Sequence, residues 1–194
     1  MMKIKESTSR ILQQLWQHNQ QNYMVVGALY HANNLLDENA TNAWPFIFAN
    51  LDQEELSKDG KPTVAEKAVF GGLHSYAIYQ QQNDKPAYAF VTEDQQNNHA
   101  GFFRMLGILR SNDDLRMNLD SQVQKILGIT NLDGILPIIY HLSAFMRSQM
   151  PKARIDFAQL SQDFYDYQHS NDLARQIRLK WGQQYYAAPS QDNN

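Results

Sequence analysis

The chain has 194 residues and carries 17 Lys and Arg against 20 Asp and Glu, which gives a formal net charge of −3. This length suits one domain, or two small bundles that share a core. Apolar residues make up 43% of the sequence and aromatic residues 11%, so a packed core is expected and a disordered protein is excluded. There is no cysteine, which excludes disulfides, thiol catalysis and cysteine-based zinc sites.

The sequence favours a cytoplasmic protein with no membrane partner. Residues 1–6 begin with charge but no apolar stretch follows them, so no signal peptide is predicted. The longest uncharged apolar segment, residues 134–146, is too short to span a bilayer and contains Pro137. The lack of cysteine agrees with a reducing compartment.

Helical periodicity begins near the N-terminus. A short helix with Pro45 in its first turn is expected over residues 43–48. Two apolar stripes precede it, the first at Ile11, Leu12, Leu15 and Trp16 and the second at Val25, Val26, Leu29, Ala32 and Leu36.

A longer helix is predicted to begin after Thr63. Thr63 and Glu66 have the spacing of a capping box, and apolar positions continue to Ala77. Gly71 and Gly72 lie inside this helix, and each costs about 1 kcal/mol of helix propensity. We therefore expect another helix to cross closely at the two glycines.

The helical pattern stops between residues 80 and 98. A turn is predicted at residues 83–86, and residues 87–92 suit either a short strand or an ordered loop. We place a boundary between two packed helical sub-bundles here. The predicted organisation is a single protein over residues 1–194, with sub-bundles at about 1–82 and 98–186, a joining loop at 83–97 and a frayed tail at 187–194.

The second half of the chain predicts further helices, so the expected fold class is all-α. Their expected positions are a helix through Phe102 and Leu109, a short helix over residues 123–127, a long apolar helix capped by Asn131, a helix opened by a capping box at Asp156 and Gln159, and a last helix capped by Ser170 or Asn171. The last helix has an apolar stripe at i, i+4 spacing, made of Leu173, Ile177, Trp181 and Tyr185. We expect Trp181 and Tyr185 to be core residues rather than platforms for base stacking.

The residues give no positive support for catalysis. The six histidines are scattered, with no pair at i, i+3 or i, i+4, so no metal site is predicted. Asp163 and Asp166 lie one helical turn apart and could act as an acid and a base, but a solvated helix face is the simpler interpretation. We predict no catalytic residues and no cofactor; a small hydrolase that uses this pair is a third interpretation.

Positive charge is concentrated in the second half of the chain. Residues 1–100 contain seven bases and eleven acids, whereas residues 101–186 contain ten bases and eight acids. Seven of these ten bases are Arg, whose planar guanidinium group suits phosphate, and a basic half can bind polyanions even in a net-acidic chain. Ordinary solvated charge is the alternative explanation for this distribution.

The last third of the chain carries motifs that resemble a known family. Residues 155–167 read IDFAQLSQDFYDY, and residues 175–182 read RQIRLKWG. They resemble the end of the CasB family, the small subunit of the type I-E CRISPR surveillance complex Cascade. In that family an I/L-D-(Y/F/W)-x-x-L-x-x-D-L-Y helix precedes an R-x-x-V-R-L-x-W helix. Residues 101–106, GFFRML, and 140–147, YHLSAFMR, are similar to two further segments of the family.

The chain also departs from the family pattern, and each departure removes positive charge. Tyr30 and His31 stand where family members have paired arginines, Ser143 and Ala144 stand where they often have Arg-Arg, and residues 121–123, SQV, stand where they have R-R-F. These changes predict a weak affinity for nucleic acid, or an affinity that depends on neighbouring subunits.

The resemblance implies a non-catalytic Cascade subunit that acts in antiviral defence. Such subunits stabilise guide RNA and the unwound DNA strands of the R-loop by phosphate contacts that read no bases, and they contact other Cascade subunits and a second copy of themselves. The expected nucleic-acid-binding residues are Arg104, Arg110, Arg147, Lys152, Arg154, Arg175, Arg178 and Lys180. The runner-up is a helical protein–protein interaction module that binds no nucleic acid and holds its arginines in salt bridges.

Overall fold

A computed structural model of the chain describes residues 3–17, 20–89 and 100–187. These residues form nine α-helices, two short 3-10 helices and one small hairpin. The α-helices are α1 Ile4–Gln14, α2 Tyr23–His31, α3 Trp44–Ala49, α4 Val64–Gln80, α5 Phe102–Leu109, α6 Asp113–Gly128, α7 Leu132–Gln149, α8 Phe157–His169 and α9 Asn171–Tyr186. The 3-10 helices are η1 Glu38–Asn42 and η2 Gln53–Glu55, and in the hairpin β1 Trp16–Gln17 pairs antiparallel with β2 Gln20–Gln21. The prediction of an all-α protein is confirmed.

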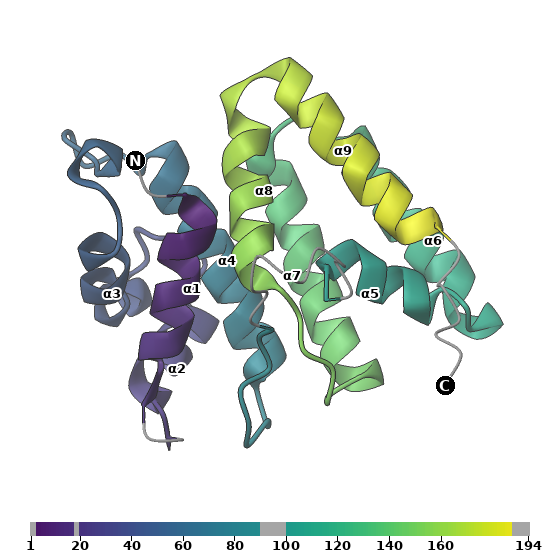
Figure 1. The fold of residues 1–194 in the computed structure, drawn as a ribbon, viewed down its shortest axis with the longest axis horizontal. Coiled ribbons are helices and arrows are strands. Elements are labelled where there is room, and N and C mark those ends of the chain that lie inside the picture. Colours follow the sequence, from purple (N-terminus) through teal and green to yellow (C-terminus); the bar gives the residue numbers. More distant parts are fainter. Residues whose placement is uncertain (1–2, 18–19, 90–99, 188–194) are drawn as a thin grey trace.

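Helix α8 is at the centre of the molecule (Figure 1). It contacts α1, α4 and α7, and it also contacts α9, which packs in turn against α5 and α6. In Figure 1, α1, α2 and α3 lie to the left of α8, and α5, α6 and α9 lie to its right. The buried apolar side chains form one continuous cluster, to which helices before and after residues 83–97 both contribute. The boundary between two sub-bundles stays a prediction.

The crossing of α4 and α8 is close because α4 presents two glycines there. A Cβ atom at Gly72 would overlap the Ser161 hydroxyl and would lie 3.1 Å from the carbonyl oxygen of Phe157. A Cβ atom at Gly71 would lie 3.2 Å from the ring of Phe164. The expected close crossing at Gly71 and Gly72 is confirmed.

Side-chain caps explain where several helices begin. At the start of α4, Thr63 Oγ1 accepts a hydrogen bond from the Glu66 N–H at 3.1 Å, and Glu66 Oε2 accepts one from the Thr63 N–H at 2.8 Å. Asn131 caps α7 and Ser170 caps α9, each through a side-chain oxygen that accepts from a backbone N–H. These predicted helix starts are confirmed.

Two expectations about helix extent and burial are wrong. The helix expected over residues 123–127 is only the end of α6, which begins at Asp113. Asn112 caps α6, and acids in its first turn favour the positive end of the helix dipole, so the helix starts well before its apolar residues become frequent. Leu36, expected in the second apolar stripe, lies beyond the end of α2 and is 62% exposed.

Part of the predicted boundary loop and most of the predicted tail lie outside the described residues. Of residues 87–92 the structure describes 87–89, where Tyr88 forms an isolated parallel bridge with Ile155. Of the tail 187–194 it describes Ala187 alone. Among the described helices, none combines the length and the apolar character needed to cross a membrane.

The close α4–α8 crossing predicts that a larger residue at Gly72 destabilises the protein. Gly72→Ala should destabilise folding by about 1–3 kcal/mol, because the added methyl group has no room beside Ser161 and Phe157. Urea denaturation followed by circular dichroism measures this change in the free energy of unfolding. Gly128→Ala is the matched control, since a Cβ atom there meets nothing within 4 Å and should cost no stability. Equal stability of the two variants would contradict the close crossing.

Candidate nucleic-acid interface

The eight predicted phosphate-binding residues differ in their exposure. Three of them have exposed side chains, namely Lys152, Arg154 and Arg175. The other five are half-buried, namely Arg104, Arg110, Arg147, Arg178 and Lys180. The eight residues come from four segments of the chain. Arg104 lies in α5 and Arg110 just after it, Arg147 lies in α7, Lys152 and Arg154 follow α7, and Arg175, Arg178 and Lys180 lie in α9. Their partners decide which of them are available to a strand.

Lys180 is bound to a buried carboxylate. Its Nζ atom lies 2.6 Å from Asp163 Oδ1, and the neighbouring Trp181 donates its indole N–H to Asp163 Oδ2 at 2.8 Å. Gln159 Nε2 donates a further hydrogen bond to Asp163 Oδ1 at 2.8 Å, although Gln159 was expected to complete a capping box with Asp156. Asp156 does cap α8, by accepting from the Gln159 N–H at 2.8 Å. The Asp163 carboxylate therefore joins α8 to α9.

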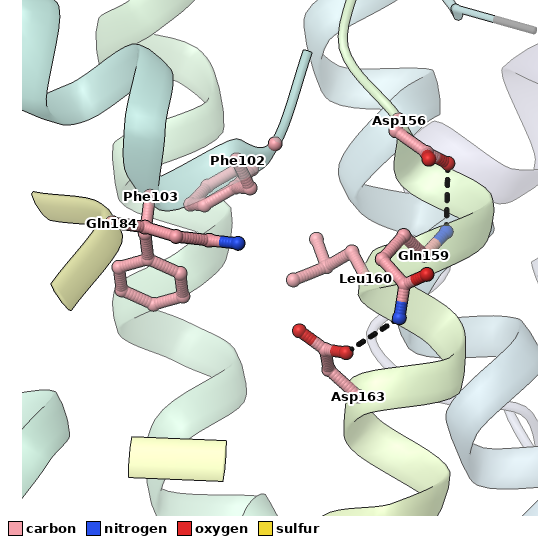
Figure 2. Close-up of a pocket in the computed structure, with 8 residues that line it drawn as sticks. Phe102, Phe103, Asp156, Gln159, Leu160, Asp163 and Gln184 are labelled. Atoms are coloured by element: carbon pink, nitrogen blue, oxygen red, sulfur yellow. Dashed lines mark hydrogen bonds between the residues drawn. The ribbon is translucent and has the colours of Figure 1, made fainter. Parts of the chain in front are cut away.

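The space beside Asp163 is too small for a substrate. Figure 2 shows Gln159 and Asp163 on α8 and Asp156 just before it, facing Phe102 and other residues of the opposite wall across a narrow gap. This gap has a volume of about 10 Å³, which is room for about one water molecule. Asp166, the proposed second member of an acid–base pair, accepts a hydrogen bond from Gln162 at 2.9 Å. The geometry gives no support to a hydrolase at this position.

Arg110 joins three helices. Its Nε and Nη2 atoms donate to the two carboxylate oxygens of Asp120 at 2.7 and 3.2 Å, which links the end of α5 to α6. The Tyr185 hydroxyl of α9 also donates to Asp120, at 2.7 Å, and the guanidinium group lies over the rings of Tyr185 and Tyr186. The hydrogen bonds from Arg110 hold the pKa of Asp120 below its usual value, so the acid stays ionised.

Arg147 and Arg178 interact with backbone carbonyl groups. Arg147 Nη1 donates to the Ile78 carbonyl oxygen of α4 at 3.2 Å. Arg178 Nη1 lies 3.5 Å from the carbonyl oxygens of Leu127, at the end of α6, and of Ile129, just after it. Both guanidinium groups therefore have a structural use, although the donors that these contacts leave free can still bind an anion.

Arg175 is held more weakly by its partner within the chain. It forms an i, i+3 ion pair with Asp172 at 3.3 Å on the outer surface of α9, where both side chains are well exposed. Exposed pairs of this kind contribute only about 0.2–1 kcal/mol, so Arg175 can change partner at little cost.

Lys152 and Arg154 meet in an open groove of about 620 Å³. The groove lies between the segment 151–154 and the turn that follows α4, and Lys85 of that turn also lines it. Among the described residues, none of these three cations forms an ion pair, and Asp84 is the one acid in the lining. Lys85 is not among the predicted phosphate ligands, because it is far from Lys152 in the chain and belongs to the acidic half.

A comparison with protein families matches residues 28–186 to the family described as CRISPR-associated protein Cse2. The chain belongs to the CasB/Cse2 family. The resemblance seen in its sequence motifs is thereby confirmed, and the match covers most of the chain.

The fold agrees with this assignment. The crystal structure of CasB from Thermobifida fusca is similar, with a TM-score of 0.67 and 17% sequence identity over 95% of this chain and 96% of that chain. At this identity the likeness shows the fold that this member of the CasB/Cse2 family adopts. A search of curated protein sequences gives no match.

The Trp181 side chain belongs to the core, as predicted. The residue is 0% exposed, its indole stacks on Phe103 at 4.7 Å and on Tyr167 at 5.6 Å between ring centroids, and its N–H group is bound to Asp163. A side chain held in this way cannot stack on a base without unfolding α9.

The burial of Trp181 predicts that truncating its side chain destabilises the protein. Trp181→Ala should lower the free energy of unfolding by about 3–5 kcal/mol, because it leaves a cavity and removes one donor from Asp163. Leu179→Ala in the same helix is the control, since Leu179 is 64% exposed and its loss should change stability by less than about 0.5 kcal/mol. Thermal and urea denaturation measure both values. A Trp181→Ala variant of wild-type stability that had lost nucleic-acid binding would identify a stacking residue instead.

Proposed function

We propose that this chain is the non-catalytic small subunit of a type I-E Cascade complex and acts in cytoplasmic antiviral defence. In this role it stabilises guide RNA and the unwound DNA strands of the R-loop through phosphate contacts that do not depend on sequence. Membership of the CasB/Cse2 family supports the role. The observation that carries it is the pair of exposed cations Lys152 and Arg154, which share a groove and have no ion-pair partner among the described residues.

The charge of the subunit predicts weak binding when it is alone. The chain has a net charge of −3, so a distant strand is repelled before short-range contacts form. Arg110 and Lys180 are already bound to carboxylates, which leaves fewer cations for phosphate than the sequence contains. Neighbouring subunits of the complex would supply the remaining positive surface.

An apolar helix face supports the proposed protein partners. Helix α2 reads YMVVGALYH and has no Asp, Glu, Lys or Arg, yet Tyr23 is 73% exposed and Met24 is 66% exposed. A helix that is apolar on all sides is normally buried, so a surface of this kind suits contact with another protein. Other Cascade subunits and a second copy of the chain are the partners that the family resemblance implies.

The runner-up, a protein–protein interaction module without nucleic-acid binding, is favoured by a different observation. Arg110 and Lys180 form intramolecular ion pairs, and Arg147 and Arg178 contact backbone carbonyls, as a purely structural use of these cations would require. This alternative predicts that the chain joins a complex but adds no salt-dependent affinity for strands.

Salt dependence separates the two functions. With about four phosphate contacts, log K against log salt should have a slope near −3 for labelled poly-dT and for a mixed-sequence strand alike. Fluorescence anisotropy between 50 and 200 mM salt measures the slope for the isolated subunit, and for the assembled complex with and without the subunit. Each phosphate contact to a single strand contributes about −0.7 to this slope. Tight binding to a single base sequence would contradict the proposal. A complex whose slope is the same with and without the subunit would support the protein-only module.

Two matched arginines test the proposed contact on α9. Arg175 and Arg116 each form an i, i+3 ion pair with an exposed aspartate, and only Arg175 is a predicted phosphate ligand. Arg175→Glu should weaken strand binding by the complex several-fold more than Arg116→Glu, although both variants change the net charge equally. Both should stay within about 1 kcal/mol of wild-type stability. Equal losses of affinity would make Arg175 ordinary surface charge.

A further inference from the structure

The groove beside the end of α4 is built from two separate segments. Its first wall is the turn at residues 82–87, which contributes Lys85, and its second wall is the segment 151–154, which contributes Lys152 and Arg154. The amides Gln82 and Asn83 also line it, and no aromatic side chain is among its described lining residues. The cations and amides within this lining suit a sugar–phosphate backbone, whereas base stacking would need aromatic rings.

The C-terminus of α4 anchors this region. The last four carbonyl groups of a helix have no partner within the helix, and here each one accepts a hydrogen bond from a nearby group. The donors are Gln81 Nε2 to Ala77 O at 3.1 Å, Arg147 Nη1 to Ile78 O at 3.2 Å, Asn83 Nδ2 to Tyr79 O at 3.1 Å, and the Asn83 N–H to Gln80 O at 3.0 Å. The turn that leaves α4 is therefore held tightly against the helix end.

The Gln80 side chain sets the course of the first wall. Gln80 is 1% exposed, and its amide NH₂ group donates to the carbonyl oxygens of Asn83 at 2.9 Å and Lys85 at 3.0 Å. Its amide oxygen accepts from the Ala87 N–H at 2.8 Å. One buried amide thus binds the backbone at the two ends of the turn and at Lys85 itself, so the position of the Lys85 side chain depends on Gln80.

The second wall is tied to the same helix end. The Tyr79 hydroxyl lies 2.6 Å from the carbonyl oxygen of Met150 and 3.0 Å from that of Ala153, on either side of Lys152. Burial raises the pKa of Tyr79 to about 12, so the hydroxyl keeps its proton. The two walls are also joined directly, by hydrogen bonds of 3.0 Å from the Ile155 N–H to the Ala87 carbonyl and from the Ala89 N–H to the Ile155 carbonyl.

We infer that this groove is the phosphate-binding site for one single strand, with Lys85, Lys152 and Arg154 as its ligands. Gln80 positions Lys85 in the first wall, and Tyr79 positions the second wall. The inference rests on the proposed function and assigns it a place on the molecule. Because the walls are held by buried hydrogen bonds in the absence of a strand, little order has to be gained on binding, and this preorganisation favours affinity. The groove takes RNA and DNA backbones alike, since both present the same phosphate group.

Matched triple variants test the ligands. Lys85→Ala, Lys152→Ala and Arg154→Ala together remove three charges, and so do Lys58→Ala, Lys61→Ala and Lys125→Ala, whose side chains are exposed and do not line the groove. Anisotropy titrations of the full-length variants, alone and in the complex, use fluorescein-labelled poly-dT and poly-U strands. The groove variant should lose about tenfold or more in affinity and should flatten the salt slope by about 2, while the control keeps the wild-type slope. Equal losses in the two variants would overturn the inference.

A charge-neutral variant tests the positioning role. Gln80→Met keeps the side-chain length and every cation but removes three hydrogen bonds to the turn. We expect a several-fold loss of affinity with a flatter salt slope, although the net charge is unchanged and circular dichroism shows a folded protein. Tyr79→Phe, which removes one hydroxyl from the second wall, serves the same purpose if Gln80→Met does not fold. Wild-type affinity and slope in a folded variant would exclude the positioning role.

The outcomes distinguish this inference from the proposed function. A wild-type subunit that adds no salt-dependent strand affinity to the complex would refute the proposed function itself. A wild type that binds strands, with a groove variant that behaves like the control, would leave the function in place and refute only the groove. A groove variant that binds strands normally but no longer enters the complex would make the groove a docking site for protein, which also overturns the inference.

Discussion

The second half of the molecule depends on one buried carboxylate. Asp163 lies in the central helix α8 and is almost fully buried, so its charge must be met by donors inside the protein. Lys180 and Trp181 of α9 provide two of these donors, and Gln159 of α8 provides a third. The carboxylate therefore determines where α9 lies against α8.

The helices of the far side follow from the position of α9. Its Trp181 stacks on Phe103 of α5, and at Gly107 of α5 a Cβ atom would come within 2.6 Å of the Tyr185 carbonyl oxygen, so α5 and α9 touch through their backbones. Tyr185 then binds Asp120 of α6, which also holds Arg110. A change at Asp163 should thus be felt in α5 and α6 through the position of α9.

The same electrostatic demand divides the basic residues into two groups. Cations near buried acids or helix ends, such as Lys180, Arg110 and Arg147, are used to join helices. Cations on the segments around the end of α4 have Asp84 as the one acid among the described residues that line their groove, and so remain available. For this reason the Arg content of the second half overstates how much of its positive charge can contact a strand. Lys85, from the acidic half, adds a third cation to the groove.

Features that depend on neighbours along the chain can be read directly from the sequence. The caps at Thr63 and Asn131 act over three residues, and Gly72 marks a close crossing because only a residue without a side chain fits there. The motifs of the last two helices were enough to indicate the family. Local rules work in these cases because the partners are a few residues apart, or because no other residue type is possible.

Features that join distant residues become visible only when the helices are packed together. The apolar periodicity predicts that Trp181 is in the core, but it does not indicate that the indole N–H donates to Asp163. Leu36 has the spacing of the apolar stripe, although α2 ends at His31. The groove needs Lys85 and Arg154 on facing walls, which the bridge between Tyr88 and Ile155 brings together. Such contacts are set by how the helices pack. The charges, hydrogen-bond partners and free space around a side chain come from segments that are distant in sequence, and the spacing along the chain does not show which of these segments will meet.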